Sequence, residues 1–277
     1  MIIDIHTHVF PKRICDKRED YFENELEFRL LYDSPKSKLV EASDLIRNMD
    51  QQGIDKSVVF GFPWNCFETA RFQNDYILEM VHAHPDRLIG FCCLNPEHSL
   101  AADEVNRCLR GGLKGVGELA FYRSGIDENL LTALAPVMSL CSEYHVPVLI
   151  HTNEPVGHQY PGKAPMTLSE IYRMVNRFPQ NTIILAHWGG GIFLYNLMKK
   201  EVKEAFKNVY VDTAASPFLY DPAIYPVAVA ALGCEKILLG SDFPLLQPSR
   251  YSGEMKKAGL SDREITAICG ENAAAFF

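Results

Sequence analysis

The sequence predicts a (β/α)8 barrel of the TIM type, and three observations support this prediction. Short apolar runs rich in β-branched residues recur eight times, separated by segments of helical character. The runs are apolar on both faces, as parallel strands covered by helices are. The alternative, a doubly wound open sheet, usually has a glycine-rich phosphate loop early in the chain, and none is present. The predicted strands are 2–6, 56–61, 87–93, 113–119, 146–152, 182–187, 208–212 and 236–242.

Helical periodicity fills the intervals between these strands, with one exception. Its clearest segments are 44–49, 76–81, 130–141, 171–178 and 192–206. No convincing helix starts before about Ser43, so the sequence predicts an extended loop insert after the first strand, over 9–42. The insert mixes aromatic and charged residues. It is either a lid or wall of a substrate pocket, or an ordinary surface loop.

The composition indicates one globular domain over residues 1–277. Hydrophobic residues make up 47% of the chain and charged residues 22%, which is enough apolar material for a large core. The net charge of −8 disfavours nucleic acid as a partner. No apolar run is long enough to cross a membrane, no signal-peptide pattern precedes the first strand, and the eight cysteines look reduced. We therefore expect a cytoplasmic protein with a small-molecule substrate. The sequence leaves self-association into a homo-oligomer open.

Two histidines close the first predicted strand. His6 and His8 lie two residues apart, and side chains two apart in a strand point to the same face. The pair can therefore share one metal ion, whereas two unliganded buried imidazoles would be costly. His82 and His84 repeat the spacing in a helical segment, where residues two apart point to nearly opposite sides. We expect no metal at that second pair.

Further polar side chains end later strands, where barrel enzymes place their chemistry. His151 and His187 close strands five and six, and Asp242 closes the last. A carboxylate at such a place needs a cation or several donors, although Asp242 could instead cap a helix. Glu118 ends strand four, either as a further metal ligand or substrate contact, or as a carboxylate bonded to loop donors.

Several loop residues are candidate substrate contacts. Trp64 and Phe243 follow strands two and eight, where aromatic rings would line the mouth or simply pack loops together, and His158 lies in the long loop after strand five. A carboxylate substrate would need a cation to hold it. Six arginines lie near catalytic-face loops by sequence, namely Arg13, Arg18, Arg29, Arg71, Arg123 and Arg250.

The ordered set of motifs resembles the amidohydrolase superfamily over essentially the whole chain. Within it, the chain is similar to the branch that includes 2-amino-3-carboxymuconate 6-semialdehyde decarboxylase and related hydrolases, lactonases and hydratases. The motifs are Asp4-x-His6-x-His8, His84-Pro85-Asp86-Arg87-Leu88, His151, Ala186-His187-Trp188-Gly189-Gly190, Gly240-Ser241-Asp242-Phe243-Pro244 and Gly270-Glu271-Asn272-Ala273.

The resemblance implies roles for particular residues. His6, His8, His151 and Asp242 match positions that hold a divalent ion, usually zinc, and His187 matches a catalytic histidine near the metal-bound water. Strand four has no lysine where binuclear members carry a carboxylated one. A second ion held through Glu118 stays open.

The main functional prediction is a metal-dependent hydrolase of an amide, ester or lactone. A bound zinc ion lowers the pKa of its water to about 7. In this hypothesis Asp242 takes a proton from that water, while His187 orients it or stabilises the oxyanion. The first alternative is a metal-dependent decarboxylase of an unsaturated or aromatic acid, in which His187 assists protonation of carbon. The second alternative is a barrel that binds metal and ligand without catalysis.

Overall fold

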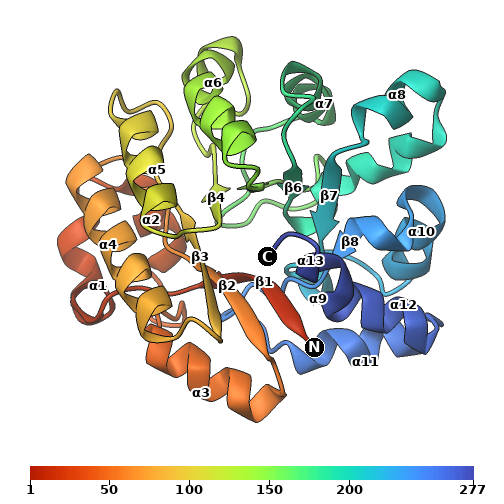
Figure 1. Ribbon diagram of the computed structural model, residues 1–277, viewed down its shortest axis with the longest axis horizontal. Helices are drawn as coiled ribbons and strands as arrows, with labels where there is room; N and C mark the ends of the chain where they lie inside the picture. Colours follow the sequence, from red (N-terminus) through yellow and green to blue (C-terminus); the bar gives the residue numbers. More distant parts are fainter.

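The structure is a computed structural model that describes residues 1–277, and it contains one sheet of eight parallel strands. The strands follow one another around the sheet in chain order, and the helices form an outer ring (Figure 1). The strands are β1 (Ile3–His8), β2 (Lys56–Phe60), β3 (Leu88–Cys92), β4 (Gly115–Leu119), β5 (Val148–Ile150), β6 (Ile183–Leu185), β7 (Val209–Asp212) and β8 (Ile237–Leu238). The predicted (β/α)8 barrel is confirmed.

Contacts between the first and last strands close the barrel. The amide of Ile5 donates to Leu239 O at 2.8 Å, and Thr7 forms a parallel bridge with Phe243. Beyond these contacts, the amide of Asp242 donates to His6 O at 2.9 Å. The first strand and the segment after the last strand are thereby joined beside His6 and Asp242, which the sequence singled out.

Helices follow the strands on the outside of the barrel. The longer ones are amphipathic or largely apolar and bury one face against the sheet. None of them is both long and apolar enough to span a bilayer. The helices are α1 (Lys12–Asp16), α2 (Leu26–Tyr32), α3 (Ala42–Gln52), α4 (Phe67–Ala83), α5 (Ala101–Arg110), α6 (Glu128–Glu143), α7 (Leu168–Arg177), α8 (Lys200–Ala205), α9 (Ser216–Leu219), α10 (Ile224–Leu232), α11 (Ser249–Lys257), α12 (Asp262–Thr266) and α13 (Asn272–Ala274).

The first strand changes which of its residues face inward. Ile5 packs into the apolar cluster inside the barrel. The register of β1 against β2 then shifts after Asp4, and the next inward rings are those of His6 and His8, which both lie against Phe60 at 5.3 and 4.7 Å between centroids. The irregular register therefore lets an apolar barrel floor be followed directly by two imidazoles.

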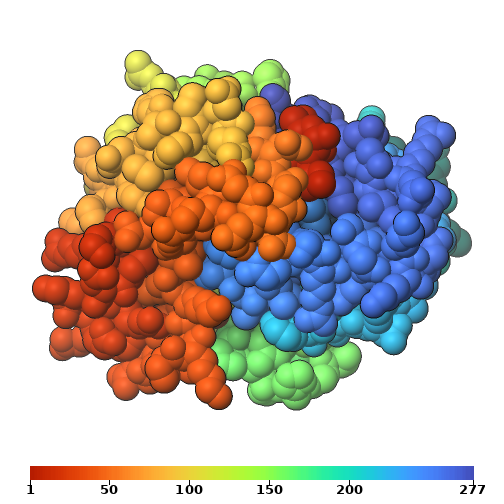
Figure 2. Space-filling view, turned by 90° about the horizontal axis from the view of Figure 1, so that it is seen from below, coloured from red at the N-terminus to blue at the C-terminus, as the bar shows by residue number.

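The insert after β1 contains the short helices α1 and α2 and a buried aromatic cluster. Phe28 of α2 is fully buried, and Trp64, from the segment after β2, lies 4.5 Å from it between ring centroids. Figure 2 shows the red and orange surface of the insert beside a green segment, and Leu31 of the insert and Gly162 line one cavity. The insert is thus a packed wall against the mouth of the barrel.

Candidate active site

A cavity of about 400 Å³ opens at the carboxyl ends of the strands. Its buried floor includes Glu118, His151 and His187. Its walls come from the segment after β2, the segment after β4 and the insert. The carboxyl-terminal face is where barrel enzymes bind substrate, because their variable loops meet there.

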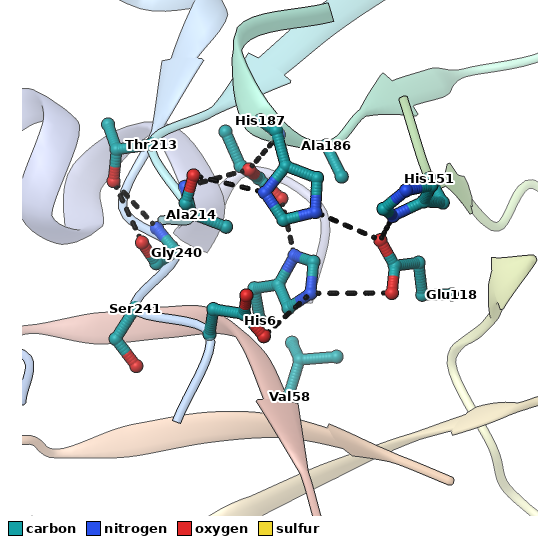
Figure 3. A network of polar contacts seen from close by, with 12 residues as sticks. His6, Val58, Glu118, His151, Ala186, His187, Thr213, Ala214, Gly240 and Ser241 are labelled. Atoms are coloured by element: carbon teal, nitrogen blue, oxygen red, sulfur yellow. Dashed lines mark hydrogen bonds and ion pairs between the residues drawn. The ribbon is translucent and has the colours of Figure 1, made fainter. Parts of the chain in front are cut away.

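Glu118 lies at the centre of the floor cluster. Figure 3 shows its carboxylate between three imidazole rings, and the Oε1 atom is 3.0 Å from His151 Nδ1 and 3.5 Å from His187 Nε2. Its other oxygen, Oε2, is 3.6 Å from Nε2 of both His6 and His8. The sequence could not separate a ligand from a loop-bonded carboxylate at this position. The structure places Glu118 among the histidines.

Asp242 closes the cluster from the side of β8. Its Oδ1 is 3.7 Å from His6 Nε2 and 3.5 Å from His8 Nε2. Its backbone has a φ of 63°, as Trp188 has 62° and His187 has 54°. Non-glycine residues rarely adopt this region, and such strained residues gather at functional sites.

Each of the four imidazoles has one ring nitrogen held by an outer acceptor. These pairs are His6 Nδ1 with Asp212 Oδ2 at 2.8 Å, His8 Nδ1 with Gly61 O at 3.1 Å, His151 Nε2 with Gly162 O at 2.9 Å and His187 Nδ1 with Ala214 O at 3.1 Å. A carbonyl or carboxylate oxygen can only accept, so these nitrogens carry the protons. The remaining nitrogens of His6 and His8 therefore face the cluster with their lone pairs available, as in metal sites.

Opposite charges set the protonation of the carboxylates. Burial alone would raise the pKa of Glu118, but the imidazoles of His6 and His151 outweigh it and hold that pKa well below its ordinary value. Burial also opposes ionisation of Asp242, yet contact with His8 and the charge on His6 lower its pKa to about 2. Both carboxylates are therefore anions at neutral pH.

These residues fit a divalent metal ion. His6 Nε2 is buried and has no hydrogen-bond partner, which is costly unless a cation accepts its lone pair. Two donors that bind one ion at about 2.1 Å lie about 3.0–3.5 Å apart, close to the separations seen here. Three overlapping sets have ligand atoms within 4.8 Å of one another: His6 with His8 and Glu118, His6 with His187 and Asp242, and Glu118 with His151 and His187.

Asp212 at the end of β7 is a site residue that the strand-end search missed. Its side chain is fully buried, and besides His6 Nδ1 it accepts from the amides of His187 and Ala214, each at 2.9 Å. It is the last residue of a predicted strand, so the rule that selected Asp242 could have selected it. One carboxylate thereby positions two of the histidines.

We expect Asp212→Asn to weaken metal binding about 10–100-fold. The amide oxygen can still accept from the two backbone amides, but the NH2 group must then face His6 Nδ1. His6 would move its proton to Nε2, which then points N–H into the cluster instead of a lone pair. Titration with Mn²⁺ followed by calorimetry measures the effect.

Asp127→Asn is the matched control for this prediction. Asp127 caps α6 by accepting only from the amide of Leu130, at 2.8 Å, and asparagine caps helices equally well. Unchanged Mn²⁺ affinity in Asp212→Asn would contradict the assignment of Asp212 as a positioning residue.

The three predicted substrate contacts have different locations. Trp64 is only 1% exposed and packs in the aromatic cluster of the insert, so the structure does not place it at the cavity. Phe243 is also buried and lines a separate hollow, whereas its neighbours Pro244 and Leu245 line the main cavity. His158 lines an adjoining cavity of about 300 Å³ that shares His151 with the main one.

Other residues that line the main cavity include aromatic rings of the segments after strands two and four, where the sequence predicted aromatic rings at the mouth or in loop packing. Phe62 and Tyr122 are stacked, with centroids 6.3 Å apart and an interplanar angle of 9°, and Tyr32 of the insert stands edge-on to Phe62. The cationic members of the wall are Lys36 and Lys38. Phe62 and Tyr122 follow strands, and this is the sequence pattern that predicted aromatic rings at the mouth.

An eight-stranded barrel with imidazoles and carboxylates at the carboxyl ends of its strands is the arrangement of metal-dependent barrel enzymes. Comparison with protein families matches residues 3–277 to the family described as Amidohydrolase. The chain belongs to this family, and it is an enzyme with a site suited to a divalent metal.

Three relatives place the chain within the superfamily. It is 24% identical to 2-amino-3-carboxymuconate-6-semialdehyde decarboxylase of Dictyostelium discoideum, over 99% of this chain and 90% of the relative. It is 22% identical to gamma-resorcylate decarboxylase of a Polaromonas strain, over 87% of this chain and 89% of the relative. The crystal structure of 5-carboxyvanillate decarboxylase from Sphingomonas paucimobilis matches with a TM-score of 0.75 and 20% identity, over 100% of this chain and 98% of the other. The resemblance inferred from the sequence is confirmed.

These relatives correct the main functional prediction. We expected hydrolysis of an amide, ester or lactone with a water activated by zinc. The relatives are named as decarboxylases, which contradicts hydrolysis and favours the alternative. The residues at strand ends do not distinguish the two reactions, because both use imidazoles and carboxylates around an ion.

Proposed function

We propose that the protein is a metal-dependent decarboxylase of an aromatic or unsaturated carboxylic acid. One observation carries the proposal: a floor of imidazoles and carboxylates lies beneath a wall of aromatic rings in a cavity of about 400 Å³. A flat ring packs well against the wall formed by Phe62, Tyr122 and Tyr32, and the cavity is large enough for a single-ring substrate. The names of the relatives point to the same reaction.

The residues proposed to hold the metal are His6, His8, His151, Glu118 and Asp242. When bound, the ion supplies positive charge that holds the substrate's oxygen atoms and offsets the negative charge that spreads into the ring. Zinc was expected from the family resemblance, and two solved structures of decarboxylases in the superfamily are described with manganese. Imidazoles and carboxylates bind both metals, so we propose a divalent transition metal and include both in the tests.

In the proposed reaction the bond between the ring carbon and the carboxylate carbon breaks. The carboxylate leaves as CO2, its electron pair stays on the ring carbon, and one proton adds there. We assign that proton to His187 Nε2. Burial disfavours the charged ring, but the adjacent carboxylate of Glu118 outweighs it and raises the pKa of His187. His187 Nδ1 is fixed on Ala214 O, so Nε2 is the nitrogen that can give a proton to the cavity.

Asp242 serves a different purpose in this scheme. With a pKa of about 2 it is an anion at neutral pH and cannot be the proton donor. It balances the charge of the imidazoles and, together with His6 and His8, restricts where the substrate's acid group can lie. The buried floor and the aromatic walls limit access of water to the ring carbon.

The test is an assay of CO2 release by protein loaded with Mn²⁺ or Zn²⁺. The substrates are 2,6-dihydroxybenzoate and 5-carboxyvanillate, with p-nitrophenyl acetate as a hydrolysis probe. We expect release of CO2 and formation of the decarboxylated ring in at least one of the metal-loaded forms, and none after chelation. Metal-dependent ester cleavage without CO2 release would overturn the proposal.

We also propose that residues 1–277 form a single folding unit. The link between Ile5 and Leu239 joins the first strand to the last, so neither half of the chain can close the barrel alone. Self-association stays a prediction. A single calorimetric unfolding transition and the mass from light scattering test the two points.

A further inference from the structure

The cationic side chains that line the cavity are not the arginines expected from the sequence. None of the six arginines near catalytic-face loops lines it. Three of them are engaged with carboxylates elsewhere: Arg29 pairs with Asp33, Arg123 with Glu27, and Arg250 with Glu254. Lys36 and Lys38 are the only lysine or arginine side chains in the wall.

Both lysines are free of internal partners. Neither has a carboxylate within 4.0 Å, whereas Lys12, which is also exposed on the insert, pairs with Asp16 at 3.2 Å. Unpaired positive charge at the mouth of a pocket in a chain of net charge −8 favours an anionic ligand. It has no evident role in folding.

Arg18 fixes the backbone that carries the two lysines. Arg18 donates through Nη1 to Ser37 O at 2.7 Å and to Tyr32 O at 3.3 Å. Ser37 lies between the two lysines, so the guanidinium of Arg18 holds this turn against the earlier part of the insert. The stems of the lysines therefore start from an ordered position, which lowers the entropic cost of binding.

The lysines and the reacting centre lie at opposite ends of the cavity. Lys36 and Lys38 are exposed at the mouth, whereas His187 is 6% exposed at the floor. The departing carboxylate must lie at the floor, because the carbon that it leaves takes a proton from His187. An acid group held by the lysines is therefore a second one.

We propose that the substrate is an aromatic or unsaturated acid with a second carboxylate, which Lys36 and Lys38 bind at the mouth while the first is lost at the floor. The inference rests on the proposed decarboxylation and adds the substrate class. Tyr32, on the edge of the same cavity, packs against the ring between the two acid groups.

Binding of benzene-1,3-dicarboxylate and of benzoate to the Mn²⁺-loaded protein tests this, because the two probes differ by one carboxylate. Calorimetry should give about tenfold tighter binding of the dicarboxylate, as ion pairs with two exposed lysines allow. In Lys36→Met/Lys38→Met the preference should fall to about twofold or less, with benzoate binding unchanged. Lys256→Met/Lys257→Met removes two exposed lysines of α11 that do not line the cavity, and should keep the full preference.

The outcomes separate this inference from the proposed function. Equal binding of the two probes by the wild-type protein, or a preference that survives in Lys36→Met/Lys38→Met, overturns the role of the lysines even if CO2 release is found. If neither 2,6-dihydroxybenzoate nor 5-carboxyvanillate releases CO2, the proposed decarboxylase activity is overturned instead, whatever the binding preference.

Discussion

His6→Ala is expected to lose the metal ion and at least about a thousandfold in kcat/KM for decarboxylation. His6 is fully buried, and its Nε2 is the one fully buried imidazole nitrogen with no hydrogen-bond partner. No other side chain can take its place, since the neighbouring imidazoles are already fixed by their own outer acceptors. Metal content by mass spectrometry and the rate of CO2 release measure both effects.

His82→Ala/His84→Ala is the control with the same sequence spacing. These histidines lie at the end of α4, are both exposed, and belong to none of the metal-suited groups. The double variant should keep wild-type metal content and rate. A His6→Ala protein that is folded by circular dichroism and still holds a full complement of metal would refute the assignment of His6 as a ligand.

The strand-end residues could be predicted from the sequence because the barrel topology determines where they lie. Parallel strands in a closed barrel bring all their carboxyl ends to one face, so His151 and Asp242 meet although they are distant in the chain. The alternation rule also brought His6 and His8 together, although the register shift in β1 shows that the alternation is not regular along the whole strand. Placement of these residues needed only the fold.

Loop residues could not be predicted in the same way. Trp64 looked like a mouth residue because it follows β2, but a large apolar ring is stabilised most where it can be buried, and Phe28 of the insert offers that place. The path of the insert has no periodic signal. Lys36 and Tyr32 therefore reach the cavity for reasons visible only in three dimensions.

The residues at the strand ends also could not distinguish hydrolysis from decarboxylation. A histidine such as His187 beside a metal can orient water for hydrolysis or donate a proton to carbon. The difference lies in what the walls hold against the floor, and here the walls are the rings of Phe62 and Tyr122. A flat acid placed against them presents its ring carbon, not a tetrahedral centre, to the imidazole.

His187→Asn is therefore expected to lower kcat about 10²–10⁴-fold while the protein keeps its metal ion. Asparagine can retain a hydrogen bond to Ala214 O, but it cannot give up a proton to carbon. In D2O the wild-type enzyme should place deuterium on the ring carbon that lost CO2, which mass spectrometry of the product detects. Metal content distinguishes this role from that of His6, because loss of the ion from His187→Asn would make His187 a ligand instead.

His145→Asn is the matched control, since His145 is exposed at the end of α6 and its φ of 55° suits asparagine. Its kcat should equal that of the wild type. If His187→Asn retained full kcat with normal metal content, the proton would have to come from another group. A proton donor other than His187 would then have to face the ring carbon, and His187 would no longer place the departing carboxylate at the floor.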